Sequence, residues 1–263
     1  MNPIIRWAGS KRYLANHLIP QFPGELKRYI EPFCGSASLF FLLEPSESIL
    51  ADINPELINA LRLIRTRSSA VMEKYESLPD DRDFFYLIRS LQPATLSKTE
   101  RAARFLYLNR LCFNGLYRTN KLGQFNVPYS GQRNSRPLLK TEIVKAGVLL
   151  KNCEILSTDF RATIERSKKG DFLYVDPPYA SNEQNQFCEY DANSFGVKDI
   201  EDLWSALKSA DKRGVKFMLS YTECTEIKKF ADYWSSESIQ VRRNIAGFAG
   251  HRKTAKEVVI KNY

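Results

Sequence analysis

The segment Asp176-Pro177-Pro178-Tyr179 carries groups that could hold a flat substrate. It directly follows an apolar run, residues 172–175, of the kind found in strands that are buried on both faces. Its two prolines fix the backbone and remove two N–H donors, which leaves carbonyl groups, one carboxylate and one aromatic ring. A surface proline turn would explain four such residues taken alone. Their position favours binding, because ligands of open α/β sheets lie beyond the carboxyl ends of the strands. Acceptors beside a ring suit a planar group that donates hydrogen bonds, such as the exocyclic amine of a nucleobase.

A second group of residues near the start of the chain could hold a nucleotide-like cofactor. Gly35 lies in a loop between a predicted strand and a predicted helix, where a small residue lets a ligand approach the backbone. Asp52 ends the next predicted strand. The separation between Gly35 and Asp52 is close to the roughly 20-residue spacing that is typical between a glycine loop and an acid that hydrogen-bonds ribose hydroxyls. A lone glycine loop is more often a tight turn, but together with Asp52 and Asp176 it predicts a cofactor pocket. The missing G-x-G-x-x-G motif speaks against a dehydrogenase.

Strand and helix patterns alternate on both sides of a helical stretch. Strands are predicted at 29–30, 48–51, 153–156, 172–175 and 215–219, with a closing antiparallel pair at 239–243 and 258–261. Helices are predicted at 39–43, from 54 onward, and at 70–78, 83–91, 99–113, 160–167, 200–212 and 225–233. This alternation predicts a doubly wound α/β sheet that is interrupted once. We therefore expect a catalytic domain formed by residues 1–55 and 138–263, and a helical insert at 56–137.

The predicted insert ends in a polar, basic loop. Its cationic residues are interleaved with aromatic ones: Arg110, Phe113, Tyr117, Arg118, Lys121, Phe125, Tyr129, Arg133 and Arg136. Basic side chains contact phosphates, arginine can read guanine with two hydrogen bonds, and an aromatic ring can enter an opened base stack. Arginines on helices are usually solvated, however, and Phe113 would also fit a core. A second basic set, Arg242, Arg243, Arg252 and Lys253, suits a phosphate clamp near the end of the chain.

The overall composition excludes several classes of protein. The 263 residues include 43% hydrophobic and 26% charged residues, the balance of a folded domain rather than of a disordered chain. The longest apolar run, 39–43, cannot span a bilayer, and the first residues lack a secretory pattern, so we expect a cytoplasmic protein without a membrane segment. Five scattered cysteines and two histidines predict free thiols and no metal site. The net charge of +9 suits either a polyanionic partner or plain solubility.

Taken together, these motifs resemble the Dam-type DNA adenine-N6 methyltransferases, which use S-adenosylmethionine. Besides the segment 176–179, the matching landmarks include Arg6-Trp7-Ala8-Gly9-Ser10-Lys11, Glu31-Pro32-Phe33-Cys34-Gly35, Leu50-Ala51-Asp52-Ile53-Asn54, Leu106-Tyr107-Leu108-Asn109-Arg110, Phe113-Asn114-Gly115-Leu116-Tyr117-Arg118, Gly123-Gln124-Phe125-Asn126-Val127-Pro128-Tyr129 and Arg252-Lys253. They run in the family's order almost from end to end. The resemblance implies a Rossmann-like methyltransferase sheet, mostly parallel with an antiparallel closing strand, and an insert that recognises DNA.

The same resemblance implies roles for particular residues. S-adenosylmethionine, without a metal, would be bound by Trp7, Lys11, Phe33, Gly35, Asp52, Asp159, Phe160 and Asp176, with Lys11 near the methionine carboxylate. Double-stranded DNA would be contacted by Arg110, Phe113, Asn114, Arg118, Asn126, Arg133, Arg243 and Arg252. Among these, Phe113 and Asn114 would fill the space of a flipped base or meet its partner, and Arg118 would read a guanine. Ser10 and Ala37 stand where the family commonly has glycine, which bears on cofactor affinity.

The residues Asp176, Pro177, Pro178 and Tyr179 would form the catalytic set. The target adenine would rotate out of the duplex and stack on Tyr179, while the Asp176 carboxylate and the Pro177 carbonyl accept its N6 hydrogens. The motif alone also serves methylation of other amines, namely cytosine N4, an RNA adenine or a protein amide. A non-catalytic DNA-binding regulator is a further alternative. We expect a monomer that associates with the nucleoid through DNA and that can act beside a cognate restriction endonuclease.

Overall fold

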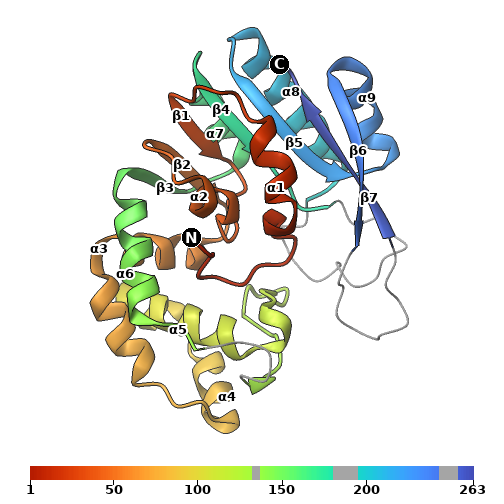
Figure 1. Cartoon of the computed structure of the whole chain (residues 1–263). Helices are drawn as coiled ribbons and strands as arrows, with labels where there is room; N and C mark the ends of the chain where they lie inside the picture. Colours follow the sequence, from red (N-terminus) through yellow and green to blue (C-terminus); the bar gives the residue numbers. More distant parts are fainter. Residues whose placement is uncertain (132–136, 180–194, 243–253) are drawn as a thin grey trace.

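A twisted sheet forms the centre of the computed structural model, which describes residues 1–131, 137–179, 195–242 and 254–263 (Figure 1). In these ranges its strands are β1 (Arg28–Glu31), β2 (Ser48–Asp52), β3 (Cys153–Ser157), β4 (Asp171–Val175), β5 (Lys216–Thr222), β6 (Ser235–Arg242) and β7 (Thr254–Lys261). They lie in the order β3-β2-β1-β4-β5-β7-β6. The neighbours from β3 to β5 are parallel, whereas β7 is antiparallel to both β5 and β6. The predicted fold class, including its closing antiparallel pair, is confirmed.

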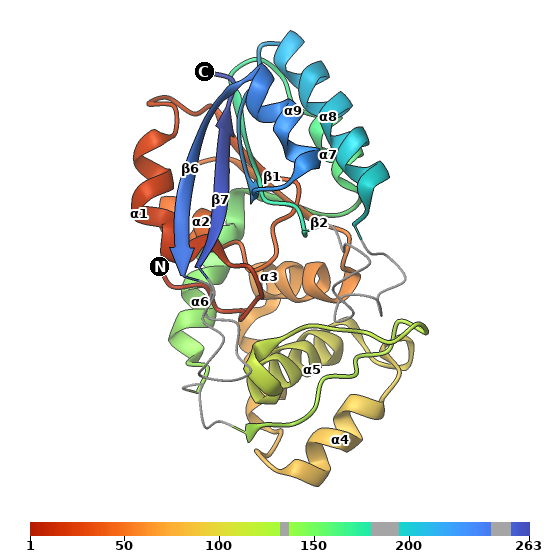
Figure 2. The same ribbon diagram turned by 90° about the vertical axis from the view of Figure 1, so that its right-hand side faces the viewer.

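Helices cover both faces of this sheet (Figure 2). One face carries α7 (Phe160–Glu165), α8 (Val197–Lys212) and α9 (Thr225–Tyr233), and the other carries α1 (Ala15–Leu18) and α2 (Ser38–Leu43). Every residue of β4 is buried, as its apolar run predicts. Alternate residues of β4 face opposite layers. Phe172 and Tyr174 belong to the core beneath α1 and α2, whereas Leu173 and Val175 belong to the core beneath α7 to α9. This alternation is what two helical layers require of a central strand.

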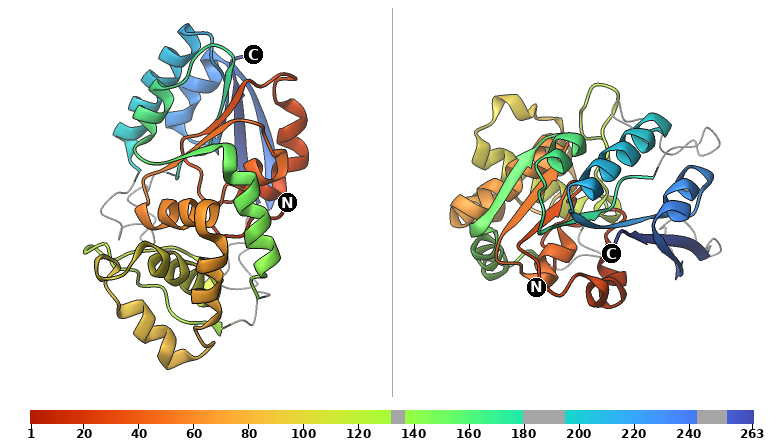
Figure 3. Two further views of the ribbon diagram at one scale, coloured as in Figure 1. Left: turned by 90° about the vertical axis from the view of Figure 1, so that its left-hand side faces the viewer. Right: turned by 90° about the horizontal axis from the view of Figure 1, so that it is seen from above.

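A helical region lies at one end of the sheet and consists of α3 (Pro55–Glu76), α4 (Arg82–Ser90), α5 (Lys98–Leu111) and α6 (Lys140–Leu149). The start of α3 is set by Asn54, whose side chain accepts hydrogen bonds from the backbone N–H groups of Glu56 and Leu57. The sequence predicts two helices in this region, one from residue 54 onward and one at 70–78, and α3 is divided between them by a kink at Arg67, whose backbone is not helical. The sequence pattern did not predict α6, which packs alongside α3 (Figure 3). No helix in the described ranges is long and apolar enough to cross a membrane.

The larger hydrophobic core joins the sheet to this helical region. It includes Leu50 of β2 and Phe172 of β4, together with Leu61 of α3, Phe105 of α5 and Ile143 of α6. A smaller core lies between α4, α5 and the segment around Phe125. The division into a catalytic domain and an insert stays a prediction. Because one continuous core contains residues of both, the helical region is packed rigidly against the sheet.

Candidate active site

The loop after β1 and the end of β2 meet at the carboxyl edge of the sheet. The backbone N–H of Gly35 donates to Asp52 Oδ2 at 3.0 Å, and the N–H of Asn54 donates to Asp52 Oδ1 at 2.9 Å. Gly35 has a φ of +47°, and a Cβ there would lie 2.7 Å from Cδ1 of the Trp7 ring. Glycine is therefore required twice, by its backbone conformation and by the close approach of Trp7. Trp7, Gly35 and Asp52, which the sequence assigns to one pocket, do lie together.

The start of α2 shows what one departure from the family pattern does to the backbone. Ala37 precedes this helix with a φ of +50° and a ψ of +40°, the left-handed conformation that glycine adopts readily. The alanine side chain is fully buried. The loop therefore keeps a backbone conformation suited to glycine although the residue is alanine, which stores conformational strain beside Gly35.

Asp176, at the end of β4, lies in a network of buried polar groups. Its Oδ1 atom is 2.9 Å from Nζ of Lys11 and accepts a hydrogen bond from the Ser220 hydroxyl at 3.1 Å. Ser220 of β5 in turn lies 2.8 Å from the Tyr174 hydroxyl. Within the described ranges no hydrogen bond is made by Asp176 Oδ2, and the side chain keeps 18% of its surface exposed. One oxygen of the carboxylate is thus tied to the protein, and the other is available to a ligand.

Tyr179 is held at both ends of its side chain. Its hydroxyl accepts from Lys11 Nζ at 3.1 Å and donates to Glu257 Oε1 at 3.0 Å. Its ring packs edge-to-face against Tyr221 with 5.4 Å between centroids. The residues of the predicted catalytic set are therefore linked through Lys11, with Pro177 buried and Pro178 exposed between them.

Burial and charge together decide the protonation of this network. Burial raises the pKa of Asp176 above its ordinary value, although the Lys11 charge opposes the shift. Burial alone would lower the pKa of Lys11, but Asp176, Tyr179 and Glu257 outweigh it, so the pKa of Lys11 lies above its ordinary value. Lys11 therefore stays charged. Its side chain, 2% exposed, is surrounded by acceptors rather than offered to solvent.

The remaining cofactor residues predicted from the sequence lie near β1 and β3. The Asp159 carboxylate caps α7 through the N–H of Arg161 at 2.8 Å and also pairs with the guanidinium of Arg161. Phe160 stacks on Phe33 with 5.1 Å between ring centroids. The helix cap accounts for Asp159 structurally, and its contact with a cofactor stays a prediction.

The residues predicted to contact DNA are only partly gathered together. Phe113 is 42% exposed in a turn beside α5, and the next residue, Asn114, has a left-handed φ of +54°. Arg118 and Asn126 face each other across a hairpin, and Arg118 Nε donates to Asn126 Oδ1 at 2.8 Å. Arg110 instead donates to the carbonyl of Ile4 at 3.0 Å. Three further candidates fall outside the described residues: Arg133, Arg243 and Arg252.

The N-terminal segment connects this hairpin region with the pocket. The backbone of Arg6 exchanges two hydrogen bonds with the side chain of Asn109, at 2.9 and 2.7 Å. The next residue, Trp7, stacks on Tyr117 with 5.7 Å between centroids, and Tyr117 contacts Phe125 in the hairpin. A single run of residues therefore touches the end of α5, the hairpin and the glycine loop.

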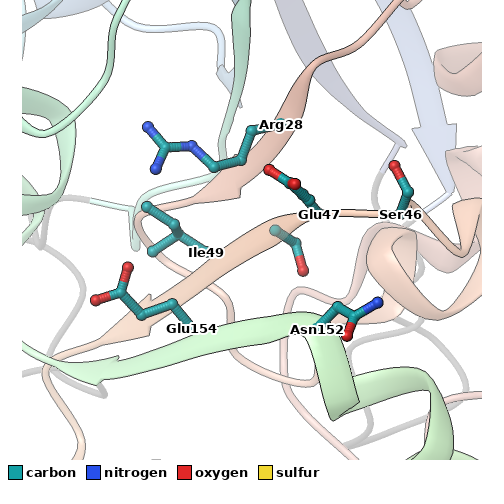
Figure 4. Close-up of a pocket in the computed structure, with 7 residues that line it drawn as sticks. Arg28, Ser46, Glu47, Ile49, Asn152 and Glu154 are labelled. Carbon is teal, nitrogen blue, oxygen red and sulfur yellow. The ribbon is translucent and has the colours of Figure 1, made fainter.

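Other features of the molecule do not add to this site. A pocket lined by Arg28, Glu47 and Glu154, among others, lies at the amino ends of β1 to β3, at the opposite edge of the sheet (Figure 4). Arg28 and Glu154 are already engaged there in ion pairs. Among the described residues, no group of histidine, cysteine and acidic side chains could hold a metal ion.

Three polar contributors to the site were missed from the sequence: Tyr13, Ser220 and Glu257. Tyr13 donates to Glu257 Oε1 at 2.8 Å, and Glu257 lies on β7 with 1% of its surface exposed. An acid next to the apolar run 258–260 was the one available signal for Glu257. The strand predicted from the sequence starts at residue 258, so nothing in the sequence pattern places Glu257 in the protein interior.

The fold and the site together define a Rossmann-like enzyme of the methyltransferase kind, with its acidic motifs at the carboxyl edge of the sheet. Residues 7–246 match the model of the D12 class of N6 adenine-specific DNA methyltransferases, and the chain belongs to this family. It is an adenine-specific DNA methyltransferase, which sets aside the cytosine, RNA, protein and non-catalytic alternatives.

Several curated proteins are similar to the chain over nearly their full length. The type II methyltransferase M1.LlaDCHI of Lactococcus lactis subsp. cremoris is 31% identical, over 100% of this chain and 96% of its own. The type II methyltransferase M.MjaIII of Methanocaldococcus jannaschii is also 31% identical, over 100% of this chain and 99% of its own. A DNA adenine methylase of Haemophilus influenzae is 30% identical, over 98% of this chain and 92% of its own.

Proposed function

We propose that this enzyme transfers a methyl group from S-adenosylmethionine to the N6 atom of an adenine that has rotated out of double-stranded DNA. The observation that carries the proposal is that the two oxygens of the Asp176 carboxylate have different environments. Oδ1 is bound by Lys11 and Ser220, whereas Oδ2 is available to a ligand beside Tyr179. Chemistry on a base inside the duplex is sterically blocked, so the base must leave the stack.

Asp176 and Tyr179 bind and orient the target adenine. The Tyr179 ring stacks on the adenine, and Asp176 Oδ2 and the Pro177 carbonyl accept the two N6 hydrogens. These acceptors favour a pyramidal nitrogen whose lone pair is directed toward the methyl group. The new bond from N6 to the methyl carbon would form as the methyl–sulfur bond breaks, and N6 would then lose one proton to water. Because positive charge develops on N6 during transfer, a fixed carboxylate stabilises the transition state more than the ground state.

The residues around Gly35 fit the cofactor. The Asp52 carboxylate suits a ribose diol, the Phe33 and Phe160 rings suit an adenine, and the small Gly35 lets a ligand approach the backbone. When bound, S-adenosylmethionine supplies an electrophilic methyl group on a sulfonium. The Trp7 ring packs closely against Gly35 on the N-terminal side of this loop. A contact of Lys11 with the methionine carboxylate stays a prediction, since Lys11 is engaged by Asp176 and Tyr179.

The charge of residues 56–137 supports the proposal that the enzyme binds DNA. Residues 56–137 contain 14 Lys and Arg against 7 Asp and Glu, a net charge of +7 out of the +9 of the chain. Such a concentration suits a phosphate backbone. Phe113 and Asn114 would meet the duplex where the base has left, and Arg118, steadied by Asn126, would read a guanine.

The same proposal covers the partner, the oligomeric state, the location and the target sequence of the enzyme. Two of the relatives, from Lactococcus lactis and Methanocaldococcus jannaschii, are type II methyltransferases, which supports a role beside a restriction endonuclease. We also propose that the enzyme works as a monomer in the cytoplasm, associated with the nucleoid. A GATC-like target is the working hypothesis for its site.

The substitution Asp176→Asn tests the proposal. It keeps an oxygen for Lys11 and Ser220 but removes the charge that stabilises N6, so the single-turnover rate should fall about 100- to 1,000-fold. Binding of S-adenosylmethionine and of DNA should persist, measured by calorimetry and by fluorescence anisotropy. Asp232→Asn, an exposed acid on α9, is the matched control and should keep the full rate. An Asp176→Asn variant as fast as this control would refute the proposed role.

A further inference from the structure

Glu257 occupies the centre of the buried network although it belongs to none of the motifs of the pocket. It lies on β7, paired with Thr222 of β5 on one side and Ile239 of β6 on the other. Its Oε1 atom accepts from the hydroxyls of Tyr13 and Tyr179 at 2.8 and 3.0 Å. Its Oε2 atom lies 3.6 Å from Lys11 Nζ and has no hydrogen-bond partner among the described residues.

The charges around Lys11 do not balance. Two carboxylates, those of Asp176 and Glu257, face one ammonium, and the Glu257 side chain is 1% exposed. Removing a carboxylate from water costs several kcal/mol, and Asp176 alone would neutralise Lys11. A second buried acid at this point is therefore not needed for charge balance.

What Glu257 does provide is geometry. The Tyr179 hydroxyl lies between Lys11, which donates to it, and Glu257, which accepts from it. These two bonds and the edge-to-face contact with Tyr221 fix the plane of the Tyr179 ring. The electrostatic attraction between Glu257 and Lys11 also fixes the position of the ammonium beside Asp176 Oδ1. It thereby determines that Oδ2 is the oxygen of the Asp176 carboxylate that remains available to a ligand.

We propose that Glu257 is a positioning residue for methyl transfer, which holds the Tyr179 ring and the Lys11 ammonium so that Asp176 Oδ2 faces the target amine. The proposal rests on the function proposed above for Asp176 and Tyr179. Glu257 itself touches neither substrate nor cofactor in this account. It acts through two hydrogen bonds and one ion pair.

The test is Glu257→Gln, which keeps the shape of the side chain but loses its charge. Single-turnover transfer of a tritiated methyl group from S-adenosylmethionine to methylation-free genomic DNA should slow by about 100-fold, the cost of a misplaced reacting group. Cofactor affinity, DNA affinity and the melting temperature should change little. Glu237→Gln on β6, whose half-exposed carboxylate binds His17 and Gln21 instead, is the matched control and should keep the full rate.

The pH profile gives a readout that a merely structural role would not move. Among the described residues, six titratable groups interact electrostatically with Asp176: Lys11, Glu31, Glu257, Tyr29, Tyr174 and Tyr179. Among them Glu257 adds to the rise in the pKa of Asp176 that burial causes and Lys11 opposes. Without the Glu257 charge this pKa falls, so the acidic limb of the rate profile should shift to lower pH. A profile that is scaled down but unshifted overturns the proposal.

A double-mutant cycle tests the route through the tyrosine. Tyr179→Phe keeps the stacking ring and removes only the hydroxyl, so Glu257→Gln should cost much less in that background than in the native enzyme. Fully additive losses contradict the proposal. If Glu257→Gln does not fold, Tyr179→Phe alone decides, because an unimpaired rate would mean that the held hydroxyl is irrelevant. An inactive Asp176→Asn beside a fully active Glu257→Gln would overturn this inference alone, whereas an active Asp176→Asn would overturn the proposed function.

Discussion

Glu31 is a second buried acid near the site, and its environment makes the stability of the enzyme depend on pH. It lies at the end of β1 with 4% of its surface exposed, and Oε1 accepts from the Tyr29 hydroxyl at 2.6 Å and from the N–H of Phe40 at 3.1 Å. Burial raises the pKa of Glu31 from 4.5 to about 8, although both hydrogen bonds oppose the shift. The folded protein therefore holds a proton here that the unfolded chain releases.

The sign of the effect follows from this raised pKa. The stabilisation is complete below pH 4.5 and is lost as the pH rises through about 8, by up to about 5 kcal/mol. We predict that Glu31→Gln, which cannot ionise, is more stable than the native enzyme at pH 9 and equal to it near pH 5. Urea unfolding across this range measures the difference. Parallel curves for the two proteins would contradict the prediction.

At the residue scale the sequence identified the groups that sit in short local motifs. Asp52, Gly35, Asp176 and Tyr179 were found because strand ends and glycine loops have recognisable neighbours. Glu257 was not found, because its partners Tyr13, Lys11 and Tyr179 are far away in the chain and only tertiary packing brings them together. Lys11, which the family resemblance assigns to the cofactor, lies among protein acceptors, and its contact with the cofactor stays a prediction.

At the element scale, the two residues that flank α2 have side chains that disfavour the left-handed backbone conformation they adopt. Left-handed residues flank this short helix, Ala37 before it and Glu44 after it. The helix nevertheless forms because Leu39, Phe40 and Phe41 bury their side chains in the core. Tertiary packing thus overrides the conformational preference of the chain at both ends of the helix.

Relieving the strain at Ala37 should stabilise the enzyme. We predict that Ala37→Gly raises the free energy of unfolding by about 0.5–1 kcal/mol, because glycine adopts this conformation without the Cβ penalty. The same change at Ala60, a buried position inside α3, should lower it by about 1 kcal/mol. Chemical denaturation of both variants checks the pair. Destabilisation by Ala37→Gly as large as that by Ala60→Gly would show that the loop is not strained.

The elements that the sequence predicted well are those with clear ends. α9 was located at its observed residues, and the Asn54-Pro55 start of α3 was correct. The two helices predicted from residue 54 onward and at 70–78 correspond to the two parts of α3, which are separated by the non-helical backbone of Arg67. α6 was missed since it directly follows the predicted insert, and its short apolar face, including Ile143 and Ala146, meets a surface that the fold creates.

At the scale of the whole molecule, charge and chemistry are separated. Residues 56–137 hold +7 of the net charge, whereas the acids Asp52, Asp176 and Glu257 lie at the carboxyl edge of the sheet. The N-terminal segment bridges the two, from Asn109 to the glycine loop. An anionic duplex would thus be attracted to one part of the molecule and presented to the other.

We propose that this enzyme methylates adenine N6 at defined sites in DNA and that Asp176 is needed for the reaction. The most direct measurement is expression of the native enzyme and of Asp176→Asn in a host without DNA methylation, followed by methylation-sensitive sequencing of the genome. We expect N6-methyladenine in one recurrent motif with the native enzyme and far less of it at the same sites with the variant. An unmethylated genome, methylcytosine instead of methyladenine, or an equally methylated genome with Asp176→Asn would contradict this proposal.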